Sequence, residues 1–290
     1  MTPLVGVVGH VEWVEFARVP RVPLAGEIVH ATEVFAEPAG GGAVAAVQLR
    51  RLAGSAMFLT ALGTGGDAER TDAGLRALGV WVHAGTRPAP QRRTFTFLDD
   101  GAERTITVLG ERIVPKRSDP LPWDALGSLD AIYLTGGDAG AVQAARAARI
   151  LVATPRALGA LAESGVMVDV LVGSASDPGE VYAAGTLSPE PRVVVRTRGG
   201  DGGTWEASDG APWIPEARRE GAWKATPLPG PKVDDYGCGD AFAAGLTYGL
   251  GAGMMLDEAI GLAARCGAAV LCGRGPYGAM LGDGDALRAG

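Results

Sequence analysis

Lysine is the scarcest of the charged residues in this 290-residue chain. Only Lys116, Lys224 and Lys232 are present, and none of them follows a glycine. The phosphate-binding loop G-x-x-x-x-G-K-S/T is therefore absent from the sequence, which excludes a P-loop nucleotidase.

Cysteine and histidine are equally scarce, at three residues each. Cys238, Cys266 and Cys272 are odd in number and form no C-x-x-C pair, so a disulfide framework and a structural zinc site are both disfavoured. The histidines form no H-E-x-x-H pattern, and isolated polar or core histidines are the simpler interpretation. Reduced cysteines suit a cytoplasmic protein, and this is the location we expect.

Long apolar runs and an excess of positive charge are also missing. No apolar stretch reaches 18 residues, which disfavours a membrane span. The formal net charge is −7, which disfavours nucleic acid as the main partner because phosphate backbones require clustered Lys and Arg. The chain is 47% hydrophobic, enough for a sizeable core, and we expect one domain over residues 1–290.

Short apolar strands alternate with helices along most of the chain. The expected strands lie at 4–9, 56–63, from 79, and at 130–136, 149–154, 168–173 and 192–197. The expected helices lie at 41–53, 67–78, from about 139, and at 155–164. Apolar runs rich in valine are typical of strands covered on both faces. The alternation therefore predicts a three-layer α/β fold, with helices on both faces of a mostly parallel central sheet.

Two segments do not follow this alternation. Residues 26–39 look extended, and residues 92–109 predict a hairpin with Asp100 and Gly101 near its turn. Neither segment fits a βαβ repeat. We therefore expect a small sheet that stands off the main domain, formed by segments at about 11–38 and 91–109. This sheet is a candidate lid, and an ordinary edge hairpin is the alternative.

The stretch V-D-D-Y-G-C-G-D-A-F, at residues 233–242, carries the strongest chemical signal. Residues 242–250 are apolar or small on nearly every side, so this helix should be buried. The amides of residues 237–239 would then point outward from its N-terminus, where the helix dipole favours a phosphate or a developing oxyanion. Asp240 beside them is either an N-cap or a general base that accepts the proton of a substrate hydroxyl.

Residues 233–242 resemble the C-terminal signature of the PfkB/ribokinase family of carbohydrate kinases, usually close to V-D-T-x-G-A-G-D-x-F. Other segments are similar to family motifs in the same order. They are the glycine pair Gly40-Gly41 before a helix, the segment 59–80, the G-x-E-R-T hairpin at 101–105, and a nucleotide loop with Thr197, Gly199 and Gly202. The resemblance covers nearly the whole chain, and its most specific part is residues 234–240.

The resemblance implies a ribokinase-like fold with a β-sheet lid over a sugar or polyol, and transfer of the γ-phosphate of Mg-ATP to a hydroxyl. Asp240 would be the base, and the amides of Gly237, Cys238 and Gly239 the anion hole. The implied substrate-binding residues are Glu12, Glu15, Gly40, Gly41 and Arg104. The implied cofactor-binding residues are Thr197, Gly199, Gly202 and Asp177, and Asp177 would also support Mg²⁺. Asp234 lies where some members bind a monovalent cation such as K⁺.

The same resemblance implies an assembly, because lid strands of this type often pair between subunits in the family. The expected partners are therefore a small-molecule substrate and a second copy of the chain in a homodimer formed through the lid, with no nucleic acid and no membrane.

Two sites depart from the family pattern. Ala45 stands where an Asn after the glycine pair contacts the sugar. The N-x-x-E motif that helps to organise Mg²⁺ and phosphate appears as residues 174–177, with Ser174 at the Asn position and Asp177 at the Glu position. The acid expected after the first strand is not clearly placed either, since Glu12 and Glu15 are both candidates. These departures leave the acceptor open but spare the catalytic motif.

Three other functions compete with this interpretation. Residues 63–68 fit the dinucleotide-binding pattern G-x-G-x-x-A, but the acidic residue expected about 20 positions later is missing. A nucleoside kinase of the same fold would share the catalytic motif, because specificity depends on the lid and the pocket. A non-catalytic sugar-binding homologue is kept open by Ala45 and the altered N-x-x-E, although the retained Asp240 argues against it.

Overall fold

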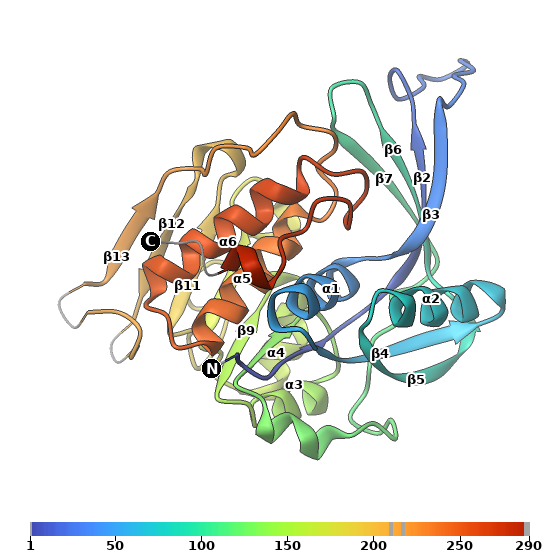
Figure 1. Ribbon diagram of the computed structural model, residues 1–290. Helices are drawn as coiled ribbons and strands as arrows, with labels where there is room; N and C mark the ends of the chain where they lie inside the picture. The colour runs from blue at the N-terminus through green and yellow to red at the C-terminus, as the bar shows by residue number, and fades with distance from the viewer. Residues whose placement is uncertain (1, 209–210, 216–217, 287–290) are drawn as a thin grey trace.

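A mostly parallel sheet forms the centre of the molecule (Figure 1). The structure, a computed structural model, describes residues 2–208, 211–215 and 218–286, and within these ranges the sheet has nine strands. In spatial order they are β13 (Glu220–Trp223), β12 (Gly203–Ala207), β11 (Val193–Thr197), β10 (Val170–Ser174), β9 (Ile150–Ala153), β8 (Ala131–Leu134), β1 (Val5–Val8), β4 (Met57–Thr64) and β5 (Trp81–Pro90). The ends of the predicted domain, residue 1 and residues 287–290, lie outside the described residues.

The parallel strands at the centre of the main sheet are deeply buried. All neighbours from β11 to β5 are parallel, whereas β12 and β13 are antiparallel additions at one edge. β1, β8 and β9 bury all four of their residues, as expected for parallel strands covered on both faces. These strands were predicted from their apolar runs, but the two antiparallel edge strands were not.

Helices cover both faces of this sheet. α1 (Gly41–Ala53), α5 (Cys238–Gly251) and α6 (Leu256–Val270) pack together on one face, where α2 (Gly66–Ala77) joins the same core (Figure 1). α3 (Ala139–Ala145), α4 (Leu158–Ser164) and the 3-10 turn η1 (Trp123–Ser128) cover the other. Val7 belongs to the first core and Val8 to the second, because successive strand residues point to opposite faces. The predicted three-layer α/β fold is confirmed.

The bounds of several helices differ from the predicted ones. The helix expected at 155–164 consists of a 3-10 turn, η2 (Pro155–Ala157), followed by α4. Two further 3-10 turns and a short terminal helix complete the described elements: η3 (Pro178–Glu180), η4 (Gly199–Asp201) and α7 (Asp283–Ala286). The helix expected at residues 242–250 begins earlier, at Cys238, and α6 was not predicted.

A second, smaller sheet stands off the main one (Figure 1). Its strands are, in order, β3 (Glu33–Ala39), β2 (Glu12–Arg18), β6 (Arg93–Leu98) and β7 (Arg104–Leu109), and they come from the two segments predicted for it. β6 and β7 form the predicted antiparallel hairpin. Within the segment expected to be extended, residues 26–39, the strand covers Glu33–Ala39. β2 ends at Arg18, which lies opposite Glu33, so the residues before Glu33 have no strand of β2 to pair with.

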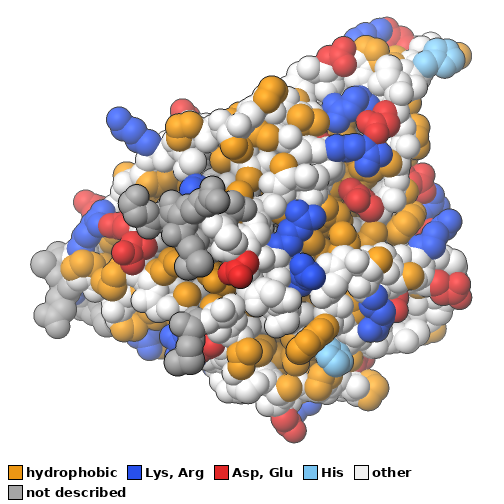
Figure 2. All heavy atoms as spheres, viewed as in Figure 1, with side chains coloured by type: hydrophobic (Ala, Val, Ile, Leu, Met, Phe, Trp, Pro, Cys, Tyr) orange, Lys and Arg blue, Asp and Glu red, His pale blue; other side chains and the backbone are white. Residues whose placement is uncertain are grey.

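The surface shows how the charges are distributed. On the described part of the face in Figure 2, Lys and Arg side chains are scattered among Asp and Glu and form no continuous basic patch. This distribution is in keeping with the net charge of −7. None of the described helices is long and apolar enough to cross a membrane.

Candidate active site

Two helix N-termini meet at one cavity. α1 begins after Gly40 and α5 after Gly237, and these two N-cap glycines have φ angles of 85° and 83°. Neither N-terminus is capped by a side-chain hydrogen bond. Gly40, Gly41 and Gly237 all line a cavity of about 360 Å³. The uncapped amides and the two helix dipoles therefore give this cavity a positive potential that favours an anion.

Asp240 is the third residue of α5, and the N-cap is Gly237. The interpretation of Asp240 as an N-cap is therefore wrong. Its carboxylate points to the start of α1, because a Cβ built on Gly41 would lie only 2.7 Å from Asp240 Oδ1. Contacts between a Cβ and another heavy atom below 3.0 Å are essentially never found. Glycine at position 41 thus allows the carboxylate to lie against the N-terminus of α1.

The surroundings of Asp240 adjust its proton affinity. The pKa of Asp240 is raised to about 7, chiefly by burial and also by the negative charge of Glu180. The guanidinium groups of Arg104 and Arg156 act against this rise. A carboxylate whose pKa lies near neutrality can accept a proton and release it again at physiological pH, which is what general-base catalysis requires.

The cavity lies at the carboxyl ends of the parallel strands, where open α/β sheets bind their ligands. His10 follows β1, Thr135 follows β8 and Thr154 follows β9, and all three line the cavity. On the side of the small sheet, the lining residues include Ile106 and Val108 of β7. The predicted hairpin therefore contributes to the same cavity as Asp240, which is the geometry that a lid requires.

Only one of the two candidate acids on β2 reaches the cavity. Glu12 is buried there, with its Oε1 2.8 Å from Arg92 Nε. Burial raises the pKa of Glu12, and the nearby Arg92 opposes this rise. Glu15 forms an ion pair with Arg93 instead and does not line the cavity. The two acids are three positions apart, so they point to opposite faces of the strand. Ala45, at the sugar-binding Asn position, is fully buried in α1 and does not line the cavity.

Arg104, the first residue of β7, connects the small sheet to the loop before α5. Its guanidinium donates to the backbone carbonyl of Asp235 and lies 3.4 Å from the carboxylate of the same residue. The hydroxyl of Tyr236, the next residue, accepts a hydrogen bond of 3.2 Å from the Gly40 N–H. These contacts join the hairpin, the loop before α5 and the start of α1 around one cavity.

A second pocket, of about 140 Å³, lies on the other side of the first turn of α5. It is lined by the three residues predicted for the nucleotide, Thr197, Gly199 and Gly202. Apolar residues form much of the remaining wall: Trp223, Leu228, Phe242, Ala264, Ala268 and Leu271. Cys238 and Gly239 line this pocket, whereas Gly237 and Asp240 line the first. The N-terminus of α5 therefore stands between the two.

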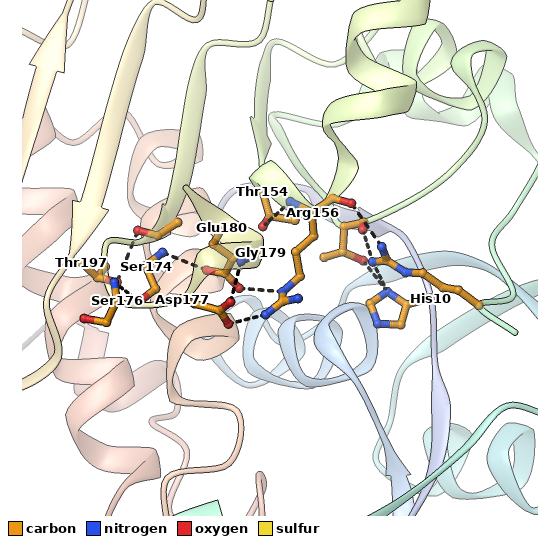
Figure 3. A network of polar contacts seen from close by, with 12 residues as sticks. His10, Thr154, Arg156, Ser174, Ser176, Asp177, Gly179, Glu180 and Thr197 are labelled. Carbon is orange, nitrogen blue, oxygen red and sulfur yellow. Dashed lines mark hydrogen bonds and ion pairs between the residues drawn. The ribbon is translucent and has the colours of Figure 1, made fainter. Parts of the chain in front are cut away.

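A polar network lies at the ends of β9, β10 and β11 (Figure 3). Glu180 accepts hydrogen bonds of 2.8 Å from Arg156 Nε and from the Ser174 N–H. Asp177 also pairs with Arg156 and accepts a 2.8 Å hydrogen bond from the Gly179 N–H. Glu180 lines the cavity together with Asp240, and Asp177 does not.

The sequence carries a signal for Glu180 that the motif alignment missed. The N-x-x-E spacing was placed at residues 174–177, but D-P-G-E at residues 177–180 has the same spacing three positions later. Asp177 is the N-cap of η3, and this turn brings Glu180 back to the Ser174 N–H at the end of β10. Glu180, rather than Asp177, is therefore the acid that the fold brings to the cavity.

The two predicted cation sites differ in how well their residues fit. Mg²⁺ takes one or two carboxylates and keeps several waters beside substrate phosphates. Glu180 lies at the cavity and pairs with Arg156, so it would meet Mg²⁺ through water rather than directly. No three His, Cys, Asp or Glu side chains in the described ranges are grouped to hold a metal ion.

Asp234 is fully buried and accepts hydrogen bonds from the Tyr236 and Gly275 N–H groups at 3.1 and 2.8 Å. Arg18 Nη2 lies 3.9 Å from its carboxylate.

Arg18 also donates a 3.2 Å hydrogen bond to the carbonyl oxygen of Val233, the residue before Asp234. A guanidinium therefore already lies beside the Asp234 carboxylate and the carbonyl that precedes it. The residues at Asp234 do not fit a K⁺ site.

Comparison with solved structures identifies the fold of this chain. The chain is similar to the ribokinase of Thermotoga maritima, with 17% identity, a TM-score of 0.75 and coverage of 98% of each chain. It is also similar to the ribokinase of Arabidopsis thaliana complexed with ribose and ATP, with 16% identity, a TM-score of 0.76 and coverage of 99% and 98%. Phosphofructokinase-2 of Escherichia coli, in complex with substrates and products, has 15% identity, a TM-score of 0.72 and coverage of 99% and 97%. The chain therefore has the ribokinase-like fold.

Sequence comparison gives a match over part of the chain. Residues 168–281, which include α5 and the stretch 233–242, match the family model described as pfkB family carbohydrate kinase. The predicted resemblance to the PfkB/ribokinase family is confirmed by this match. No curated protein matches the chain in sequence.

Proposed function

We propose that this protein is an ATP-dependent kinase that transfers the γ-phosphate to a hydroxyl of a sugar-like acceptor, with Asp240 as the general base. The observation that carries the proposal is the position of Asp240. A carboxylate whose pKa is about 7 stands at a helix N-terminus between two pockets, one polar and one largely apolar. The pfkB family match and the ribokinase-like fold support the same function.

The two pockets suit the two substrates. The apolar pocket behind Cys238 and Gly239 would hold the adenine end of ATP, with Thr197, Gly199 and Gly202 along the phosphates. The polar cavity would hold the acceptor, with Glu12 and the start of α1 around its hydroxyls. The γ-phosphate would then lie at the N-terminus of α5, between the pockets.

Transfer needs a base on one side and a stabilised phosphoryl group on the other. Asp240 would take the proton of the attacking hydroxyl as the new oxygen–phosphorus bond forms and the bond between the γ-phosphorus and the bridging oxygen breaks, which releases ADP. The amides of residues 237–239 and the α5 dipole would stabilise the negative charge on the phosphoryl oxygens, without a lysine. Glu180 would hold Mg²⁺, through water, on the side of Ser174; when bound, the ion neutralises phosphate charge.

The test is turnover with a panel of acceptors. Sugars, sugar derivatives, polyols and nucleosides would be incubated with Mg-ATP, and the products identified by mass. We expect a phosphorylated sugar-like product. Phosphorylation of nucleosides alone would assign the protein to nucleoside kinases of this fold. Binding of sugars without any product would support a non-catalytic homologue and refute the proposal.

A further inference from the structure

Four arginines line the acceptor cavity: Arg92, Arg104, Arg112 and Arg156. Two of them are engaged by carboxylates outside or at the edge of the cavity. Arg104 pairs with Asp235, and Arg156 pairs with both Asp177 and Glu180. The other two, Arg92 and Arg112, lie on the side of the cavity where Glu12 and His10 are found.

Arg112 has only neutral partners. Its Nη2 donates to the Thr135 carbonyl at 2.7 Å and to His10 Nδ1 at 2.9 Å, and its Nη1 donates to the Arg156 carbonyl at 3.2 Å. Among the described residues, no carboxylate lies within ion-pair distance of Arg112. These bonds use three of the five N–H donors of a guanidinium, so two remain for a ligand.

Arg92 is only partly satisfied. Its Nε lies 2.8 Å from Glu12 Oε1, yet this buried nitrogen makes no hydrogen bond, because its N–H is not directed at an acceptor in the described structure. Burial lowers the pKa of Arg112, and the nearby positive charge of Arg92 lowers it further. Two like charges are thus held near each other in a partly buried place, and of the two arginines Glu12 pairs with Arg92 alone. This arrangement is costly unless another anion joins it.

The arginine pair lies close to the reacting end of the cavity. The Cβ position of Gly41 is 2.7 Å from Asp240 Oδ1 and 3.6 Å from His10 Cε1. Arg112 donates to Nδ1 of the same imidazole ring, the atom bonded to Cε1. His10 therefore lies between Arg112 and the start of α1, where the Asp240 carboxylate is found, and Arg92 lines the same cavity. Figure 3 shows His10 and Arg156 on the same network. One small acceptor molecule can reach both the base and the arginines.

We infer that the phosphoryl acceptor carries an anionic group, a carboxylate, phosphate or sulfonate, that binds between Arg92 and Arg112. This inference rests on the proposed kinase function and names its substrate class. Guanidinium groups offer donors only, in a planar fork that matches such anions. A neutral sugar would leave the donors and the positive charge of this side of the cavity without a partner. The acceptor is therefore a sugar acid or a sugar phosphate rather than a free sugar.

The test compares matched acceptors. Glucose, gluconate and glucose 6-phosphate, and fructose with fructose 6-phosphate, would be measured with Mg-ATP for turnover and, by calorimetry, for binding. We expect an anionic member of a set to bind at least roughly tenfold more tightly than its neutral counterpart, because a charge-assisted hydrogen bond is worth about 1.5–3 kcal/mol. Whether the carboxylate or the phosphate form is preferred distinguishes the two sources of the anion.

Substitutions of the two arginines test whether they bind the anionic group of the acceptor. Arg112→Gln and Arg92→Gln should each weaken binding of the anionic acceptor by roughly 10- to 100-fold and leave ATP binding unchanged. Arg112→Lys, which keeps the charge but not the planar fork, should lose less. Arg93→Gln is the matched control, since Arg93 is the next residue along the chain but pairs with Glu15 away from the cavity. Melting curves check that each variant is folded.

The outcomes separate this inference from the proposed function. Anionic binding that Arg112→Gln abolishes, without any product, would support the inference and refute the kinase. Turnover of neutral sugars at least as efficient as that of their anionic forms would support the kinase and overturn the inference. Equal binding of neutral and anionic forms by the wild-type protein would overturn it as well, whether or not any variant folds.

Discussion

A single methyl group at position 41 should displace the base. In Gly41→Ala the added Cβ would lie 2.7 Å from Asp240 Oδ1, whereas ordinary contacts begin at 3.4 Å. The carboxylate must therefore move by roughly 0.7 Å or rotate away, and a misplacement of about 1 Å at a reacting group can cost roughly 10²-fold in rate. We expect kcat to fall by about 10- to 100-fold, with little change in the melting temperature.

Gly66→Ala is the matched control for this substitution. Gly66 is also the first residue of a helix, α2, and also follows an N-cap glycine with positive φ, but nothing lies within 4 Å of its Cβ position. Steady-state kinetics with the acceptor found in the panel would compare the two variants. Gly66→Ala should keep wild-type turnover. Wild-type turnover in Gly41→Ala as well would refute the catalytic placement of Asp240 against α1.

Three further predictions concern the charges around the site. Because Asp240 must be ionised to accept a proton and its pKa is about 7, kcat/KM should fall about tenfold per pH unit below that value; a profile flat down to pH 5 would argue for another base. Glu180→Gln should raise the Mg²⁺ concentration needed for half-maximal turnover more than Asp177→Asn does, and an equal or reversed order would contradict the placement of Glu180. Replacing K⁺ by Na⁺ or a large organic cation should leave turnover unchanged because Arg18 lies beside Asp234, and strong activation by K⁺ would show that this arrangement is wrong.

The layers of the fold could be predicted because short apolar runs in the sequence indicate which strands are buried. Runs such as residues 4–9 are apolar or small on both sides, and a sheet covered by helices on both faces buries such strands. The edge strands β12 and β13 have half-exposed residues and no such run, so nothing in their composition separated them from loops. Their place follows from tertiary pairing: β12 pairs with β11, which precedes it in the chain, and β13 pairs with β12.

The site was predictable where the chemistry lies in one continuous motif, and not where the fold brings distant residues together. Asp240 and the glycines before it are adjacent in sequence, so their role could be proposed directly. The choice between Glu12 and Glu15 required the orientation of β2, and a shift of one residue reverses it. Arg112 belongs to no motif and reaches His10 only because the chain returns to the cavity after β7. No spacing in the sequence indicates that contact.

The most direct test of the proposed function is the rate of phosphoryl transfer by Asp240→Asn. The amide keeps the shape of the carboxylate but cannot take a proton, so kcat should fall by roughly 10²–10⁴-fold. ATP binding should remain, because the amides of α5 and the pocket at Thr197 are unchanged. The variant should melt no lower than the wild type above pH 7, since burial disfavours the charge that the substitution removes. A folded Asp240→Asn variant that binds ATP and barely turns over is the predicted result; near wild-type turnover would contradict the role of Asp240 as the base.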